Sequence, residues 1–227
     1  MLGRLLSRLL NSVDKPTASS PESVSQKRWS QAQEFEAGWW KQWLQEHPDG
    51  NDDQWLGYVA GQFGLDPRQA FDGEVVVDVG GGPLGLLTKL RADRRIVVDP
   101  QPIPSFDKGI ERIQASGEAI PLPEGLADRV LFYNVLQHVR CPRDVLNECV
   151  RITKPGGRIY GLEQLHVPTD LGHPHTLTEA MFETWLAEAP LTLERQELTP
   201  DASFAGPDQP GEAILCLVAT KHSATTT

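Results

Sequence analysis

The sequence has few cysteines and no long hydrophobic run. Three of its 227 residues are cysteines, Cys141, Cys149 and Cys216, and their spacing makes no metal-binding pair and leaves an odd thiol. A reducing cytoplasm is therefore the expected compartment. No apolar stretch approaches the roughly 20 residues that cross a bilayer, so no transmembrane segment is expected.

Basic residues are also outnumbered. The chain has 21 Lys and Arg against 31 Asp and Glu, which gives a formal net charge of -10. Proteins that bind nucleic acid through its phosphates rely on clustered positive charge. The charge balance therefore argues against a nucleic-acid partner, although it leaves room for a local basic patch.

The length suits one domain with a large core and an appendage. We expect a flexible segment at 1–27, a helical cap at 28–72, a main domain at 73–221 and a tail at 222–227. The first thirteen residues, MLGRLLSRLLNSV, predict a short amphipathic helix without a signal-peptide cleavage site. We interpret it as a terminus that is frayed or docked on a partner, with contact to a membrane surface as the alternative.

Aromatic residues make up 7% of the chain, yet many of them fall between residues 28 and 71. They recur there with aliphatic residues at helical spacing, and a turn-forming stretch at 47–51 separates two expected helices. Two interpretations stay open for Trp39, Trp40 and Trp43. They either pack a helical cap on the main domain or form a lid over a cofactor, because a flat aromatic face excludes water and attracts a cation.

The central motif is VVVDVGGGPLG at residues 75–85. Its β-branched first half is typical of a strand buried on both faces, and the glycine cluster allows a tight turn against a ligand. Pro83 suits the first turn of a helix, so we expect a helix at 84–91.

A second buried strand is expected at residues 95–100, RIVVDP, and it ends at Asp99. The carboxyl ends of parallel strands share one edge of a sheet, where ligands bind. This arrangement places Asp99 beside the turn formed by Gly80 and Gly82.

The glycine turn fits two classes of cofactor. Gly80, Gly82 and Gly85 have the spacing of the dinucleotide fingerprint, with Asp99 as a ribose ligand. However, Asp78 would direct negative charge at a pyrophosphate, and Pro83 removes an N–H donor from the helix start. A cofactor with a cationic amino-acid end therefore fits better.

Residues 74–165 resemble the class I S-adenosylmethionine-dependent methyltransferases, whose first motif is an Asp-x-Gly-x-Gly hairpin that carries the methionyl part of the cofactor. The resemblance extends more loosely to residue 220. It implies an α/β, Rossmann-like doubly wound fold, in which a C-terminal antiparallel hairpin closes a mostly parallel seven-stranded sheet. The N-terminal helical cap is added to that fold. The implied cofactor is S-adenosyl-L-methionine.

The same resemblance assigns cofactor-binding roles. It gives the methionyl part to Asp78, Gly80 and Gly82, and the ribose to Asp99. Glu118 and the N–H of Ala119 would meet the adenine edge, where the family more often has an aspartate. Asn134 would face the reactive sulfur, and in the lid interpretation Trp40 covers the cofactor.

Later segments predict the rest of the sheet. We expect a third strand at 112–116 and a fourth strand that runs into a loop over 127–139, with a turn similar to the family's Leu-x-His-Val motif. A helix at 142–153 should end at Lys-Pro-Gly-Gly, before a strand at 158–163. A helix at 177–189 and two final strands at 191–198 and 213–220 complete the expected elements.

Methyl transfer needs alignment and a dry site, and it needs a base only where the acceptor is a hydroxyl or a protonated amine. Neutral histidine suits that task. The expected catalytic candidates are His138, His173 and His175, with Glu163 and Tyr160 as further candidates. The histidines of the 164–176 loop lack a Cys or Glu partner set, so we expect no metal.

These patterns favour an S-adenosylmethionine-dependent methyltransferase that acts on an oxygen or nitrogen of a small-molecule acceptor. Val135, Leu136 and Gln137 replace the two prolines and the aromatic residue that base methyltransferases often carry, which argues against base methylation. An NAD-linked oxidoreductase is one alternative, although the chain lacks a Tyr-x-x-x-Lys pair after the fourth strand. The other is a non-catalytic, cofactor-binding interaction protein of the same fold.

Overall fold

The computed structural model describes residues 22–46, 53–66, 70–83, 85–102, 108–204, 206–207 and 211–223. Its helices are α2 (Gln26–Glu46), α3 (Asp53–Phe63), α4 (Pro142–Ile152) and α5 (Glu179–Glu188), with 3₁₀ turns η1 (Leu86–Thr88) and η2 (Leu136–His138). Its strands are β1 (Ala70–Val79), β2 (Arg91–Asp99), β3 (Ile110–Gln114), β4 (Ala127–Tyr133), β5 (Thr153–Leu165), β6 (Leu191–Pro200), β7 (Ala202–Ser203), β8 (Gly206–Pro207) and β9 (Ala213–Lys221).

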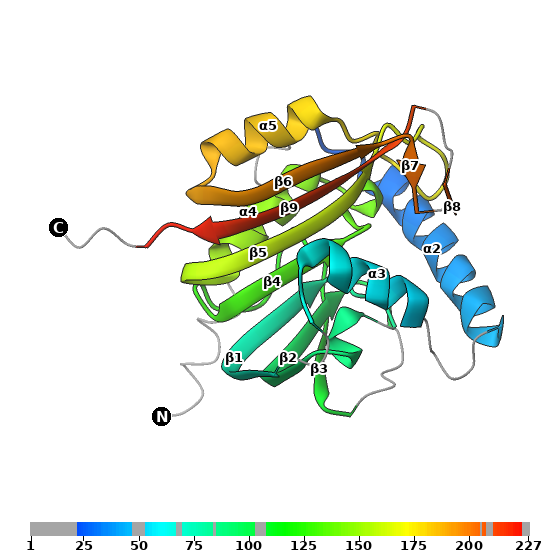
Figure 1. Ribbon diagram of the computed structural model, residues 1–227. Helices are drawn as coiled ribbons and strands as arrows, with labels where there is room; N and C mark the ends of the chain where they lie inside the picture. The colour runs from blue at the N-terminus through cyan, green and yellow to red at the C-terminus, as the bar shows by residue number, and fades with distance from the viewer. Residues whose placement is uncertain are drawn as a thin grey trace, which may run out of the picture.

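Seven of the strands form one mixed sheet in the order β3-β2-β1-β4-β5-β9-β6 (Figure 1). β1 to β5 pair in parallel, whereas β9 is antiparallel to both β5 and β6. The predicted Rossmann-like sheet with a closing antiparallel hairpin is therefore confirmed. β7 and β8 form a small separate hairpin in the β6–β9 connection.

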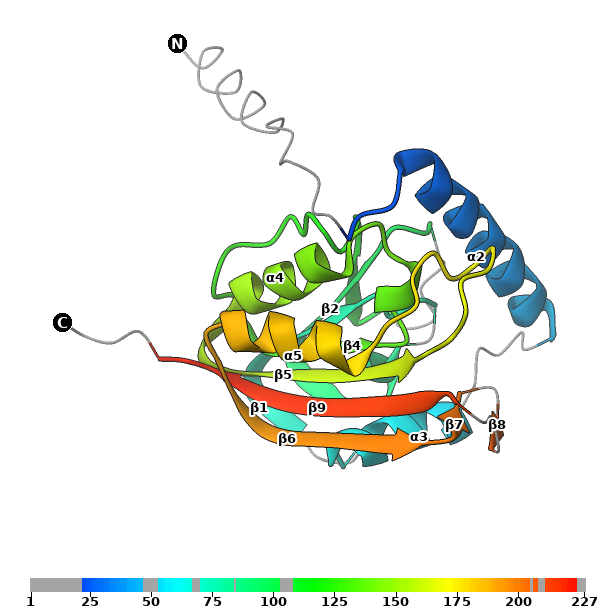
Figure 2. The same cartoon turned by 90° about the horizontal axis from the view of Figure 1, so that it is seen from above.

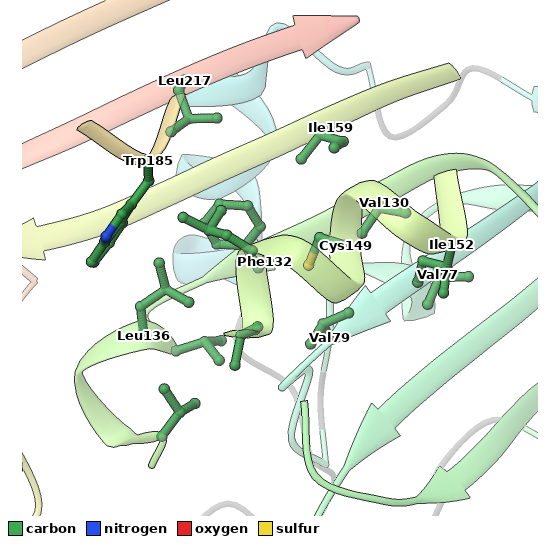
Figure 3. Close-up of a cluster of buried hydrophobic side chains, with 14 of the residues drawn as sticks. Val77, Val79, Val130, Phe132, Leu136, Cys149, Ile152, Ile159, Trp185 and Leu217 are labelled. Carbon is green, nitrogen blue, oxygen red and sulfur yellow. The ribbon is translucent and has the colours of Figure 1, made fainter. Parts of the chain in front are cut away.

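Helices cover both faces of the sheet. Figure 2 shows α4 and α5 along one face and α3 along the other, while α2 crosses the carboxyl ends of the parallel strands. Because successive strand side chains alternate between faces, Val76 packs with the α3 layer and Val77 with the α4 layer. Figure 3 shows Val77, Phe132, Cys149 and Trp185 within the second of these cores.

The two N-terminal helices differ in how they pack. α3 buries Leu56, Val59 and Phe63 in the same hydrophobic core as β1 and β4. α2, by contrast, buries only Ala32 of its described residues completely. The expected break at 47–51 lies outside the described residues, between the end of α2 and the start of α3. The predicted amphipathic segment 1–13 also lies outside them.

The prediction of a helix at 84–91 is wrong. The described residues of this stretch, 85–91, form only the 3₁₀ turn η1, because β2 already begins at Arg91, which pairs with Ala70 of β1. Too few residues remain between the glycine turn and β2 for a regular helix.

Smaller boundary predictions also need correction. The third strand lies at Ile110–Gln114, two residues earlier than expected. The Lys-Pro-Gly-Gly stretch forms the start of β5, because β5 pairs with β4 from Thr153 onward with one register shift. Among the described residues, no helix is both long and apolar enough to cross a membrane.

Candidate functional site

A cavity of about 560 Å³ is lined by residues at the carboxyl ends of the parallel strands and by helix α2. This volume is in the range of small-molecule sites. The strand side contributes Gly80, Gly81, Asp99, Asn134 and His138, and the loops after β3 and β5 add Glu118 and His173. The helix side is aromatic, because Trp29, Phe35, Trp39, Trp40 and Trp43 all line it.

The glycine turn forms the floor of this cavity. Gly80 and Gly82 have φ angles of 74° and 57°, which side-chain-bearing residues rarely adopt. A Cβ atom at Gly80 would lie 2.6 Å from Cγ2 of Val135, and one at Gly82 would lie 3.0 Å from Cζ2 of Trp40. The turn therefore packs directly against the loop after β4 and against α2, with no room for side chains.

Asp78 lies buried under this turn, with no exposed surface. Its Oδ2 accepts a 2.9 Å hydrogen bond from the hydroxyl of Tyr133, which in turn accepts one of 2.6 Å from the N–H of Leu86. Its Oδ1 has no hydrogen-bond partner among the described residues. Burial raises the pKa of Asp78 to about 7. Asp78 is not among the residues that line the cavity, so this oxygen, which has unused capacity for a cation, lies beneath the turn.

Asp99 contacts the glycine turn, as the sequence predicted. Its Oδ2 accepts a 3.0 Å hydrogen bond from the N–H of Gly82, and its Oδ1 accepts one of 2.8 Å from the N–H of Gln101. Burial raises the pKa of this carboxyl. Each carboxylate oxygen has a second lone pair, so Asp99 can accept further hydrogen bonds from a ligand in the cavity. Arg112 completes this corner by donating to the carbonyl of Gly82 at 2.8 Å.

Glu118 lines the cavity, but its carboxylate is already engaged. Oε1 accepts hydrogen bonds from the N–H groups of Arg140 (2.6 Å) and Cys141 (3.0 Å), just before α4, and Oε2 accepts one from the hydroxyl of Ser116. The N–H of Ala119 donates to the carbonyl of Ser116 at 3.1 Å. These contacts stabilise the turn between β3 and β4, and the adenine role stays a prediction.

The loop after β4 is held by buried Glu163. Both of its carboxylate oxygens accept hydrogen bonds of 3.1 to 3.3 Å from the N–H groups of Val135 and Leu136. Burial raises its pKa to about 7. Glu163 therefore shapes the loop that carries Asn134, whose Oδ1 accepts a 2.7 Å bond from the side chain of Gln137. Tyr160, the other further candidate, is buried in the core with α3 and does not line the cavity.

The three histidine candidates separate in space. His138 and His173 both line the cavity, with ring centroids 4.8 Å apart. His175 does not: its ring is buried and its Nε2 lies 2.9 Å from the carbonyl of Val139. Burial lowers the pKa of His175. His175 therefore lies outside the lining of this cavity, with Nε2 directed at the backbone of the loop after η2, and its catalytic role stays a prediction.

His138 has two acceptors at one ring nitrogen. Its Nδ1 lies 3.1 Å from the carbonyl of Gly172 and 3.2 Å from Oε1 of Glu36 on α2. Burial lowers the pKa of His138, but the Glu36 carboxylate, the Gly172 carbonyl and the charge of Glu163 together outweigh that effect, and the pKa lies above its ordinary value. The only other ring-nitrogen contact recorded for the described residues joins Nε2 to Nε2 of Gln137 at 3.4 Å.

One stripe of α2 faces the cavity. Its members recur at alternating spacings of four and three and lie on one face of the helix: Trp29, Gln33, Glu36, Trp40 and Trp43. The side-chain amide of Gln33 donates to the carbonyl of His138 at 3.2 Å, and its oxygen accepts a 2.9 Å hydrogen bond from the side-chain amide of Gln101. Sequence reasoning noted the tryptophans of this stripe but missed its polar members, whose signal is their position in the same stripe.

The described part of the chain contains no group of three or more His, Cys, Asp or Glu side chains arranged to hold an ion. His166 lies 2.8 Å from Glu179, and His173 lies 3.1 Å from Asp170. Each of these loop histidines thus faces a single carboxylate.

Comparison with known proteins connects this site to a family. A model described as "Methyltransferase domain" matches residues 77–161, from β1 to β5. An uncharacterized methyltransferase from Mycobacterium sp. (strain JLS) is 39% identical over 93 residues, which cover 37% of this chain and 36% of the relative. The chain therefore matches little more than a third of the length of this curated relative.

Solved structures share the fold at low sequence identity. A putative methyltransferase from Haloferax volcanii, solved in complex with the activator Trm112, is 17% identical, with a TM-score of 0.55 over 77% of this chain and 97% of that chain. The [4+2]-cyclase SpnF is 16% identical, with a TM-score of 0.58 over 76% and 81%. Residues 77–161 are thus similar in sequence to methyltransferase domains, and the chain shares its fold with these solved structures.

Proposed function

We propose that this protein transfers the methyl group of S-adenosylmethionine to an oxygen or nitrogen of a small-molecule acceptor. The observation that carries this proposal is the single cavity that joins the glycine turn and Asp99 to His138, His173 and the aromatic stripe of α2. Cofactor-binding groups and a candidate base thus share one enclosed space. The reaction would take place in a reducing cytoplasm; among the described residues, the buried Cys141, Cys149 and Cys216 form no disulfide.

The residues present fit this cofactor. Its methionyl end carries an ammonium group, and the unpaired, buried Oδ1 of Asp78 offers a matching charge beneath the glycine turn. The backbone of Gly80 and Gly81 borders the cavity, so a ligand there would contact the glycine turn directly. Asp99 would bind the ribose hydroxyls with its remaining lone pairs.

Three other residues complete the proposed cofactor site. Asn134 and Trp40 would flank the sulfonium, since both line the cavity and Trp40 lies directly over Gly82. Glu118 borders the cavity on the side of β3, where the adenine would bind. The cofactor supplies a methyl group that is already activated for displacement, so the protein contributes alignment and exclusion of water.

The residues on the remaining wall of the cavity indicate which acceptors would fit. Trp43, Trp55 and Phe204 provide an apolar surface, and Gln164 provides a polar group among them. Such a wall favours a small molecule with a flat, apolar body and a polar reacting group. His138 or His173 would accept the proton that a hydroxyl or ammonium acceptor must lose.

The first experiment measures cofactor choice. Isothermal titration calorimetry with S-adenosylmethionine, S-adenosylhomocysteine and NAD should show binding of the first two only. Binding of NAD alone would overturn the proposal. Mass spectrometry of any ligand that co-purifies with the protein gives an independent reading of both cofactor and product.

The second experiment measures turnover. Phenols, carboxylic acids, arylamines and aliphatic amines are incubated with the protein and with S-adenosylmethionine labelled in its methyl group. Transfer of label to an oxygen or nitrogen supports the proposal. Tight cofactor binding without transfer to any acceptor would favour the non-catalytic interaction protein, and transfer to carbon alone would refute the assignment of the acceptor atom.

A further inference from the structure

We infer that Glu36 of helix α2 is a positioning residue for His138, and that the pair selects acceptors that must lose a proton as they are methylated. This inference rests on the proposed function for its reaction, but the coupling between the two side chains is measurable without it. Helix α2 would then supply part of the proton-transfer machinery as well as covering the cofactor site.

The geometry of the pair is the first argument. Oε1 of Glu36 lies 3.2 Å from Nδ1 of His138, and the side chains are only 18% and 14% exposed. The carbonyl of Gly172 lies 3.1 Å from the same nitrogen. Two acceptors at Nδ1 require the proton there, so Nε2 of neutral His138 carries the lone pair, which faces the side-chain amide of Gln137 at 3.4 Å.

The surroundings of the pair are the second argument. The glycine at 172 brings its loop against α2, since a Cβ atom there would lie 2.8 Å from Cδ1 of Phe35 and 3.3 Å from Oε1 of Glu36. Arg28 of α2 donates to the carbonyls of Asp170 and Leu171 in the same loop. Helix, loop and η2 thus hold Glu36 in place from three sides.

The helical stripe is the third argument. Glu36 and Trp40 are one turn apart, so the helix that places Trp40 on Gly82 also places Glu36 on His138. Docking of α2 therefore covers the glycine turn and orients the base in a single step. The other titratable groups that face His138 are Glu163, from β5, and His173, from the loop after β5.

The chemistry follows from the tautomer. When the acceptor reacts, its O–H or N–H bond breaks and the proton moves to Nε2 of His138. The electron pair released on the acceptor forms the bond to the methyl carbon, as the pair of the broken carbon–sulfur bond stays on sulfur. Glu36 stabilises the imidazolium that results, and the proton then leaves to water. Acceptors without a proton to lose gain nothing from this pair.

The test is the titration of His138 in the full-length protein, followed by NMR of ¹⁵N- and ¹³C-labelled histidine. Loss of one signal in His138→Asn assigns it among the six histidines. In the wild type we expect the Nδ1–H tautomer and a raised pKa. Glu36→Gln should lower that pKa and reduce the preference for the Nδ1–H form, because the amide carries no charge.

Two variants on the same helix serve as controls. Glu34→Gln removes the same charge from an exposed position outside the stripe, and it should leave the titration unchanged. Gln33→Ala breaks the hydrogen bonds of α2 to His138 and Gln101 but keeps the carboxylate of Glu36. If Gln33→Ala lowers the pKa as far as Glu36→Gln does, the effect comes from helix docking, and the inference is overturned. An unchanged titration in Glu36→Gln overturns it equally.

Activity provides a second readout with an acceptor from the turnover experiment. The rate should rise with pH as His138 loses its proton, and Glu36→Gln should shift this rise to lower pH. It should lower the plateau by about tenfold, less than the roughly 10²–10⁴-fold contribution of a general base, because His138 itself remains. If Glu36→Gln lowers the maximal rate but does not change the pH at which the rate rises, the inference is contradicted. Because the NMR titration needs no turnover, failure of the proposed function and failure of the Glu36–His138 coupling remain distinguishable.

Discussion

Replacement of Asp78 by asparagine should stabilise the cofactor-free protein above pH 7 and weaken cofactor binding. The carboxyl is fully buried, one of its oxygens has no hydrogen-bond partner among the described residues, and burial raises its pKa from 3.8 to about 7. Asparagine has nearly the same shape and no charge. The substitution therefore removes the energetic cost of an unpaired buried anion together with its affinity for an ammonium group.

The magnitude follows from the pKa. A carboxyl whose pKa is raised in the folded state contributes its full stability below pH 3.8, and that contribution is lost as the pH rises to about 7. At about 1.36 kcal/mol per pH unit, ionised Asp78 costs about 4 kcal/mol above pH 7. The new amide donor lacks a partner, which costs about 1 to 3 kcal/mol. The net gain in the free energy of unfolding should be about 1 to 3 kcal/mol at pH 8, and it should turn into a loss near pH 4, where the cost of the amide is no longer offset.

Urea unfolding followed by circular dichroism from pH 4 to pH 8 measures this difference. Asp128→Asn is the matched control with the opposite sign. Burial raises the pKa of Asp128, but the ammonium group of Lys154 at 2.7 Å outweighs it and holds the pKa below its ordinary value. Asp128→Asn should therefore lose stability at pH 8 and not at low pH.

Two results would refute the reasoning about Asp78. A stability difference that is constant across the pH range would show that the carboxyl is not held at a raised pKa. Unchanged affinity for S-adenosylhomocysteine at pH 8, measured by calorimetry, would show that Asp78 does not bind the cofactor's ammonium group.

Three further substitutions test the cofactor site. Gly82→Val should abolish cofactor binding in a folded protein, because a side chain there would contact Trp40 and the φ angle of 57° disfavours valine. Gly57→Ala, in open space on α3, is the control. Full cofactor binding by the valine variant would show that the glycine turn is not part of the cofactor site. Asp99→Ala should weaken S-adenosylmethionine and S-adenosylhomocysteine alike by about 1 to 3 kcal/mol, and unchanged dissociation constants would exclude Asp99 from the ribose site. Cofactor titration should change indole fluorescence, and Trp40→Ala should remove most of that change; a constant signal at saturation would mean that the tryptophans only pack.

Much of the strand framework could be predicted from local pattern. The β-branched runs that end at Val79 and Asp99 indicated buried parallel strands, and the parallel arrangement alone placed Asp99 beside the glycine turn, where it now accepts a hydrogen bond from Gly82. A tight glycine turn after a buried strand leaves few alternatives, because both features arise from neighbours in sequence.

Other local signals were overridden by chain length and pairing. Pro83 and the leucines after it predicted a helix, but the pairing of Arg91 with Ala70 leaves space for the turn η1 alone. Glu118 has the sequence position of an adenine ligand, yet its carboxylate accepts backbone N–H groups at the start of α4. Which donors reach a carboxylate depends on segments that lie far away in the sequence.

The proton-transfer group shows the same division. The sequence by itself determined that His138 follows the fourth strand and therefore lies at the ligand edge of the sheet. Only the tertiary structure brought Glu36 to its Nδ1 and turned the ring of His175 to the carbonyl of Val139. Periodicity in α2 specifies which residues share a face, but not which partner that face meets, because the contact forms only when the helix docks across strand ends from another part of the chain.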